Sequence, residues 1–325
     1  MILHEHPDVF GTLIEESRSM FDVPAAYIEK DYWVTRSLML LSISDVADKI
    51  VFKGGTSLSK AHKIITRFSE DIDLAVLNID QSGNQIKKLL KKTEDTMTVE
   101  LSYNKNHAQE SKGSAFRKTV YDYPKLNDTG NIGPVMDSIL IEVNSFTKPE
   151  PFSVIEINSY IGDYLQEKGE NDLIKKYALA SFFVNTLDVE RTLIEKIMGL
   201  VKISYHNDYE NSLTNKIRHV YDIVMILRKE KYATFLSSLD VIQMITSVVE
   251  SEQDLPGKMK TDWLSNPLSA AKIFSQSDAI VPMLAQVIQG DFKQMVFHTN
   301  VPDAKEITGA LNNVRSVLSQ YDNKT

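Results

Sequence analysis

The sequence predicts an α+β protein in which a small mixed sheet with flanking helices is followed by an all-α region. In the first half, short apolar runs are separated by Gly, Asn, Asp and Pro, which is typical of strands and turns. After about residue 160 the apolar residues recur at helical spacing and continue to do so. We therefore expect a first domain over residues 1–160 and a helical domain over residues 161–325 that closes the cleft of the first.

Each expected element follows from its local pattern. Residues 7–47 are expected to be helical, with an amphipathic segment over Val9–Met20 and a second helix that starts at Pro24 and runs over Ala25–Leu41. The expected strands are Ile50–Lys53, Ile72–Leu77, Thr98–Ser102, Phe116–Tyr121, Ile139–Phe146 and Ser153–Ile157. The later helices are expected at Asp188–Ile203, Thr214–Lys229, Tyr232–Glu250, Asp278–Gln289 and Asp303–Tyr321, and long loops at Asn104–Gly113 and Gln253–Pro267.

Composition excludes several kinds of site. The chain has 325 residues, 42% of them hydrophobic, and no cysteine, so disulfides, thiolate nucleophiles and Cys-ligated zinc are excluded. Any metal must be held by oxygen or imidazole ligands. No run approaches the roughly 20 apolar residues that span a bilayer, and the N-terminus does not resemble a signal peptide. We expect a cytoplasmic protein with no membrane partner.

The net charge of −8 argues against general coating of nucleic acid, but the charge is unevenly distributed. Between Lys49 and Ser69 there are five basic side chains and no acidic one, and four more lysines lie within 86–92. The second cluster more often indicates a solvated helix face than a contact to RNA. A motif that runs from residue 52 to residue 74 begins inside the first cluster.

That motif ends in two carboxylates. In the segment 68–74 (FSEDIDL), strand alternation places Asp71 and Asp73 on one face and turns Ile72 and Leu74 to the core. Two aspartates on one face form a platform for a hard cation such as Mg²⁺. Because an Asp-x-Asp pair alone is more often simply solvated, its neighbours decide its meaning.

A glycine turn precedes the aspartates. After the apolar strand 50–53, Gly54 and Gly55 let the backbone approach a ligand, Thr56 or Ser57 can cap the following helix, and its first N–H groups attract phosphate. Taken alone, two glycines more often indicate only a tight strand-to-helix connection. The order of strand, Gly-Gly-Thr, helix and Asp-x-Asp strand is rarer than any of its parts and favours metal-dependent phosphoryl chemistry.

A third carboxylate is expected on a neighbouring strand. Glu142 lies inside the apolar run 138–144, where an acid needs a partner or a metal to offset its desolvation. It is a stronger candidate than Asp137 at the start of that strand. The alternative is an exposed position on the polar face of an edge strand.

These segments carry a resemblance to a known family. The runs Lys53–Lys60 (KGGTSLSK) and Arg67–Leu74 (RFSEDIDL) resemble the AbiEii/AbiGii toxins, polymerase-β-like nucleotidyltransferases of type IV toxin–antitoxin and abortive-infection systems. The runs 27–34 (YIEKDYWV), 191–196 (RTLIEK) and 218–223 (RHVYDI) resemble further motifs of that family. The resemblance covers about residues 27–228 and implies a polymerase-β-like core.

The resemblance also implies roles for single residues. It places Mg²⁺ on Asp71 and Asp73, to which the sequence adds Glu142, and gives catalytic roles to Lys196 and Asp222. The NTP phosphates would be contacted by residues of the turn and its basic surroundings: Gly54, Gly55, Thr56, Ser57, Lys60 and Arg67. Lys196 would act on the triphosphate, oriented by Asp222, and Arg67 would hold a phosphate or pair with Asp71. Arg191 stands where the family's third motif has an acid, with Glu190 and Glu195 nearby.

The helical motifs and the function each leave alternatives open. Lys196 and Asp222 lie on helices where charges often only face water or form surface pairs. The leading hypothesis is transfer of a nucleotide from an NTP to the 3′ end of tRNA or another RNA, with an antitoxin as cognate partner. Nucleotidylation of a protein and NTP binding without turnover are the alternatives.

Overall fold

The computed structural model describes residues 1–77, 82–126, 136–146, 148–253, 262–297 and 301–324. The chain divides into two compact units, Met1–Leu187 and Asp188–Thr325. The predicted loop at Gln253–Pro267 lies largely outside the described residues. Among the described helices no single one is long and apolar enough to cross a membrane; the segments Glu230–Leu236 and Asp240–Ser251 meet that test only as a pair bent by 73°.

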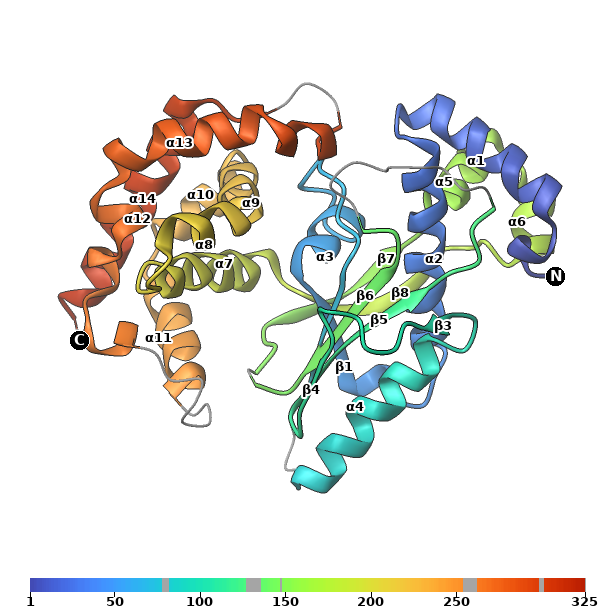
Figure 1. Cartoon of the computed structure of the whole chain (residues 1–325), viewed down its shortest axis with the longest axis horizontal. Helices are drawn as coiled ribbons and strands as arrows, with labels where there is room; N and C mark the ends of the chain where they lie inside the picture. The colour runs from blue at the N-terminus through green and yellow to red at the C-terminus, as the bar shows by residue number, and fades with distance from the viewer. Residues whose placement is uncertain (78–81, 127–135, 147, 254–261, 298–300, 325) are drawn as a thin grey trace. The chain divides into compact units, whose positions relative to one another are not determined.

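The first unit is built on one eight-stranded mixed sheet (Figure 1), which confirms the predicted α+β class. Its strand order is β3-β5-β6-β2-β1-β8-β7, and β4 pairs with β5. The central pairs are β1 with β2, antiparallel, and β2 with β6, parallel. The strands are β1 (Ile50–Lys53), β2 (Ile72–Val76), β3 (Ser102–Tyr103), β4 (Ser111–Lys112), β5 (Phe116–Asp122), β6 (Ile139–Asn144), β7 (Phe152–Ile157) and β8 (Phe182–Leu187).

Three predictions about the strands were wrong. The expected strand Thr98–Ser102 is a turn and a bend in which only Ser102 belongs to a strand, and β4 lies inside the expected loop 104–113. The strand β8 falls in the region expected to be entirely helical. It pairs in parallel with β1 and antiparallel with β7. The first compact unit therefore extends to Leu187, beyond the boundary expected at residue 160.

Six α-helices belong to the described part of the first unit. They are α1 (Pro7–Phe21), α2 (Ala25–Ser42), α3 (Gly54–Lys60), α4 (Gly83–Met97), α5 (Tyr160–Lys168) and α6 (Asn171–Tyr177). In α1 the buried residues Phe10, Leu13, Ile14 and Ser17 recur at helical spacing, as the sequence predicted. The helix α2 is buried almost all round, including the charged run Glu29–Asp31. It is therefore a core helix of the unit.

The helices α2 and α4 pack on the same face of the sheet. Leu41 of α2 lines a small pocket with Ile50 and Phe52 of β1, and Glu94 of α4 accepts hydrogen bonds from Arg117 and Tyr121 of β5. Because successive side chains of a strand alternate between faces, Lys53, which follows Phe52, points to the other face. That second face has α3 beside β1 and β2.

The second unit is helical. Its helices are α7 (Val189–Ile203), α8 (Tyr209–Asn215), α9 (Ile217–Leu227), α10 (Glu230–Leu236), α11 (Asp240–Gln253), α12 (Lys272–Ser275), α13 (Ser277–Gln289) and α14 (Ala304–Asp322). The predicted helices over 214–229 and 232–250 are each interrupted, whereas α7, α13 and α14 lie as predicted. α14 begins with a capping box, in which the side chains of Asp303 and Glu306 each accept a hydrogen bond from the backbone N–H of the other residue. It packs against α9 and α13.

Candidate active site

A row of four charged residues crosses the middle of the sheet. The register places Lys53 opposite Asp73, Asp73 beside Glu142, and Glu142 opposite Lys118. All four are half-buried. The row therefore presents charges in the order plus, minus, minus, plus on one face. We call these residues, with Asp71, the charged row.

Glu142 has a partner in this row. Its Oε2 lies 3.8 Å from Lys118 Nζ, and the two side chains are 34% and 33% exposed. The strand β6 lies between β5 and β2, so the alternative of an edge strand was wrong for Glu142. Directly neighbouring like charges are destabilising, and Asp73 and Glu142 are such neighbours. A lysine at each end, or a bound cation, offsets that repulsion.

Asp71 immediately precedes β2 and is half-buried like Asp73. Its backbone carbonyl accepts a hydrogen bond from Thr56 Oγ1 at 2.5 Å, and the same hydroxyl lies 3.0 Å from Ser69 Oγ. Ile72, between the two aspartates, is fully buried, whereas Asp71 and Asp73 are not. This alternation agrees with the prediction that the two aspartates share one face. The Thr56 hydroxyl fixes the backbone of Asp71.

The glycine turn is shaped around two of these side chains. Gly54 has φ +79°, in the left-handed region, and a Cβ there would lie 2.1 Å from Asp73 Oδ2. A Cβ on Gly55 would lie 2.5 Å from Arg67 Nη2. Both positions need glycine because the carboxylate of Asp73 and the guanidinium of Arg67 lie against the backbone of the turn.

The hydroxyls of the turn do not cap α3. Thr56 and Ser57 are fully buried, and Ser57 Oγ donates to Gly54 O at 2.9 Å. The N-terminus of α3 has no side-chain cap, so the expectation of a Thr56 or Ser57 cap was wrong. Both hydroxyls instead stabilise the fold of the turn. Arg67 is 3% exposed and donates from Nη1 to Phe68 O.

Lys60 has a carboxylate partner inside the unit. Its ammonium group is hydrogen-bonded to Asp31 of α2, and the two side chains are 8% and 6% exposed. The structure thus gives Lys60 a buried ion pair where the sequence suggested a phosphate contact. Another such pair joins Lys30 of α2 to Glu70, the residue before Asp71.

Sequence reasoning assigned no role to Lys30, Asp31 or Glu70. The available signal was a run of three charges, Glu29–Asp31, flanked on both sides by apolar residues of an expected helix. A charge inside a buried helix needs a partner, because desolvating it alone is costly. That argument predicts partners for these residues but does not identify them.

Lys196 and Asp222 lie in the second unit and pair with each other. Lys196 Nζ is 2.6 Å from Asp222 Oδ2, and the side chains are 7% and 0% exposed. The alternative that they merely face water was wrong. Arg191 is also buried, and its Nε lies 3.4 Å from Glu195 Oε1. Arg191 stands where the resemblance led us to expect an acid. It pairs with an acid, Glu195, one helical turn further on.

The donor set of the charged row fits a hard divalent cation. Among the residues that the structure describes, no three Asp, Glu or His side chains form a ready-made metal cluster. Mg²⁺ does not require one, because it commonly keeps several waters and binds one or two carboxylates together with substrate phosphates. Asp71 and Asp73 meet that need, while Glu142 is held by Lys118.

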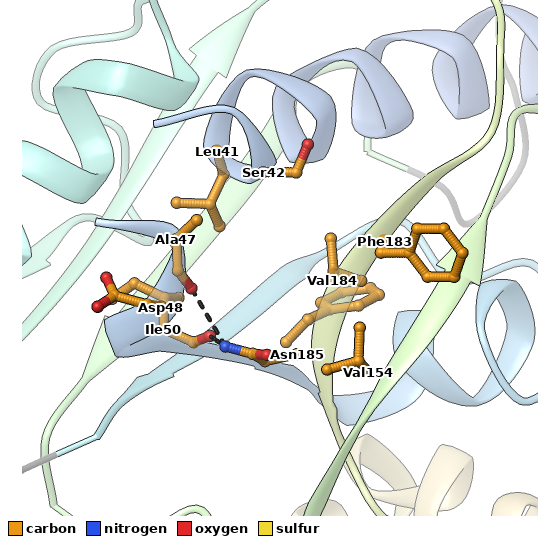
Figure 2. A pocket seen from close by; sticks show the side chains of 10 residues that line it. Leu41, Ser42, Ala47, Asp48, Ile50, Val154, Phe183, Val184 and Asn185 are labelled. Carbon is orange, nitrogen blue, oxygen red and sulfur yellow. Dashed lines mark hydrogen bonds between the residues drawn. The ribbon is translucent and has the colours of Figure 1, made fainter. Parts of the chain in front are cut away.

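A pocket of about 130 Å³ lies elsewhere in the first unit (Figure 2). It is lined by Ile50, Phe52 and side chains of α2, β7 and β8, and Asn185 donates to the backbone carbonyls of Ala47 and Ile50. Since Ile50 and Phe52 alternate with Lys53, this pocket is on the face of the sheet opposite the charged row. It is a separate, mainly apolar feature.

The site combines the strand β1, a glycine turn that lies against Asp73, and a neighbouring strand that carries Glu142. This combination defines a site of the nucleotidyltransferase class. The profile of the family described as nucleotidyl transferase AbiEii toxin, type IV TA system, matches residues 36–307. The chain therefore belongs to the AbiEii nucleotidyltransferase toxin family. The match extends past residue 228, where we expected the resemblance to end, and starts after the 27–34 motif.

The fold is similar to that of a solved toxin. MenT4, a nucleotidyltransferase toxin of Mycobacterium tuberculosis H37Rv, superposes with a TM-score of 0.51 at 13% sequence identity, over 92% of this chain and 83% of that one. At that identity the likeness concerns the fold. A search of curated proteins finds no match. The family implies an NTP as substrate and an antitoxin as partner.

Proposed function

We propose that this nucleotidyltransferase uses Mg²⁺ and an NTP to add a nucleotide to an RNA, at the 3′ end of tRNA, in the cytoplasm. The observation that carries the chemistry is the contact of Asp73 with the glycine turn: Gly54 has no Cβ where Asp73 Oδ2 lies. The charged row and the turn thus form one surface of the first unit.

In the proposed reaction the acceptor hydroxyl oxygen attacks the α-phosphorus of the NTP. The bond from that phosphorus to the bridging oxygen breaks, pyrophosphate leaves, and the hydroxyl proton passes to solvent or a base. Bound Mg²⁺, held by Asp71 and Asp73, would neutralise charge on the triphosphate. Glu142 is proposed as a further carboxylate of the site once released from Lys118.

The remaining predicted residues divide by their environment. We propose that Gly54, Gly55 and Arg67 form the phosphate-binding surface, and that Thr56, Ser57 and Lys60 maintain its shape, because their polar groups bond within the unit. In the second unit, we propose that Asp222 orients the ammonium group of Lys196. Lys53 and Lys63 are proposed to guide the RNA backbone.

The test is a label-transfer assay. The full chain is incubated with each α-labelled NTP, Mg²⁺ and total RNA, and we expect label in material that RNase digests and protease does not. Label in protease-sensitive material would instead establish a protein as acceptor. NTP binding with no transfer to any acceptor, or transfer that survives Asp73→Asn, would contradict the proposed chemistry.

A further inference from the structure

A closed ring of contacts joins the segments that carry the candidate site. It runs from α2 to the segment before β2, from there to α3, and from α3 back to α2. Its contacts are Lys30 with Glu70, Thr56 with Asp71 and Lys60 with Asp31. We call Lys30, Asp31, Thr56, Lys60 and Glu70 the buried ring, to which Asp71 contributes only its backbone carbonyl.

Lys30 joins α2 to the aspartate segment. Its side chain is 0% exposed, and its ammonium group is hydrogen-bonded to Glu70 Oε2 and, at 2.5 Å, to Met136 O. Glu70 Oε1 accepts from Met136 N at 3.4 Å. Since Glu70 is covalently joined to Asp71, this pair fixes the point from which the first candidate metal ligand extends.

Asp31, the next residue of α2, joins the same helix to α3. Its Oδ1 is hydrogen-bonded to Lys60 Nζ, and its Oδ2 accepts from Tyr160 N at 2.9 Å. Lys60 is the last residue of α3, whose first residue is Gly54. The pair therefore holds the far end of the short helix that begins at the glycine turn.

Two further contacts tighten the ring. Thr56 Oγ1 donates to Asp71 O, which ties α3 to the aspartate segment directly. The ring of Tyr27 stacks on Phe68 with centroids 4.2 Å apart and an interplanar angle of 12°. The glycine turn and the aspartates are thus both fixed to α2 and to each other.

We propose that Lys30 and Asp31 are positioning residues that hold Asp71 and Asp73 in a geometry that binds a divalent cation. This inference rests on the proposed function for the identity of the site. Replacing a buried ion pair by apolar residues is often neutral or stabilising, so two adjacent pairs of this kind are not needed for stability. A role in fixing ligand geometry explains why they occupy a helix that is buried almost all round.

The test compares removal of one partner with removal of both. Lys30→Met leaves Glu70 buried without its cation and is expected to lower Tm, whereas Lys30→Met/Glu70→Met is expected to recover Tm. Residues that orient metal ligands typically affect metal affinity by about 10- to 100-fold, so the double variant is expected to weaken Mn²⁺ binding by about tenfold or more. Mn²⁺ binding is measured by electron paramagnetic resonance. The binding that is lost in Asp73→Asn is the binding at the candidate site.

A matched control lies on the same helix. Arg36 of α2 makes a two-point ion pair with Glu100, with N–O distances of 2.6 and 2.8 Å, and neither residue belongs to the buried ring. Arg36→Met/Glu100→Met is expected to keep the Mn²⁺ affinity within about twofold, as for a pair whose role is stability alone. An equal loss in both double variants would overturn the proposal.

The second pair gives an independent measurement. Asp31→Asn/Lys60→Met removes both charges but keeps an acceptor for Tyr160 N–H, and it is also expected to weaken Mn²⁺ binding. Recovered Tm with wild-type Mn²⁺ affinity in either ring variant would overturn the proposal. If the wild type binds Mn²⁺ and the variants behave as expected but no nucleotide is transferred, the proposed function fails while the ring's role stands.

Discussion

The charged row and the buried ring lie in the same unit and are both made of acids and lysines, but they differ in exposure. The Glu142 and Lys118 side chains are about one-third exposed, whereas the ion-paired side chains of the ring are at most 8% exposed. A carboxylate that binds a cation must keep oxygens available, and a charge that fixes geometry need not. The half-exposed carboxylates are therefore the proposed cation ligands, and the buried ion pairs of the ring are the proposed positioning residues.

The second unit shows the same contrast within helices. Lys196 and Asp222 are almost fully buried, while Lys231 is 71% exposed and pairs with Glu190 at 3.0 Å. Exposed pairs contribute little, and a buried pair becomes costly when one partner is lost. Loss of one partner is therefore expected to matter far more in the buried pair than at the surface.

The largest expected effect concerns the buried pair of the second unit. Lys196→Met leaves Asp222 charged and fully buried, and is expected to lower the free energy of unfolding of this unit by about 3–5 kcal/mol. Trp263 reports on the unit during urea unfolding in a Trp33→Phe background, since the chain has two tryptophans. Lys231→Met is the control, with an expected change below about 1 kcal/mol. Equal effects of the two substitutions would contradict the assignment.

The next effect separates activity from stability. Asp73→Asn keeps the size of a half-exposed side chain but removes its charge, so unfolding is expected to change little. The rate of label transfer is expected to fall about 1,000-fold, since metal-based charge stabilisation contributes several kcal/mol. Asp137→Asn, at a 61% exposed carboxylate paired with Lys125, is the control and is expected to transfer normally. Comparable losses in both variants would remove Asp73 from the chemistry.

The sequence predicted the parts of this site that are local. The strand β1, the glycine turn and the Asp-x-Asp pair are contiguous in the chain, and turn chemistry and alternation sufficed to place them. The sequence predicted that Glu142 lies on a strand neighbouring that of Asp73. It did not predict the register that places the two residues side by side. The partner of Glu142, Lys118, is contributed by a third strand, β5.

What the sequence did not reveal depends on distant partners. The strand β8 lies among helical patterns and is a strand because it pairs with β1 and β7. The ring residues Lys30 and Glu70 are 40 positions apart, and Asp31 and Lys60 are 29 apart. No local pattern encodes such pairs, so tertiary packing decided them.

A smaller effect tests the contact that defines the site. Gly54→Ala introduces backbone strain at φ +79° and a Cβ that collides with Asp73 Oδ2. Gly169→Ala is a matched control, because Gly169 has φ +74° and nothing within 4 Å of its added Cβ. Both are expected to cost about 1–2 kcal/mol in stability. Only Gly54→Ala is expected to reduce label transfer, by about 10- to 100-fold, as the carboxylate is displaced. Normal transfer by Gly54→Ala would show that this contact is dispensable.

The smallest expected effect decides whether Glu142 is a cation ligand. Lys118 lies 3.8 Å from Glu142 and competes with a cation for its carboxylate. Lys118→Met is therefore expected to tighten Mn²⁺ binding by about two- to fivefold, the range of an exposed ion pair of up to about 1 kcal/mol. Lys112→Met is the control, because the register places Lys112 opposite Arg117 on the other face, where it pairs with Glu110. If Lys118→Met leaves Mn²⁺ affinity unchanged while Asp73→Asn abolishes binding, the cation is held by the two aspartates without Glu142.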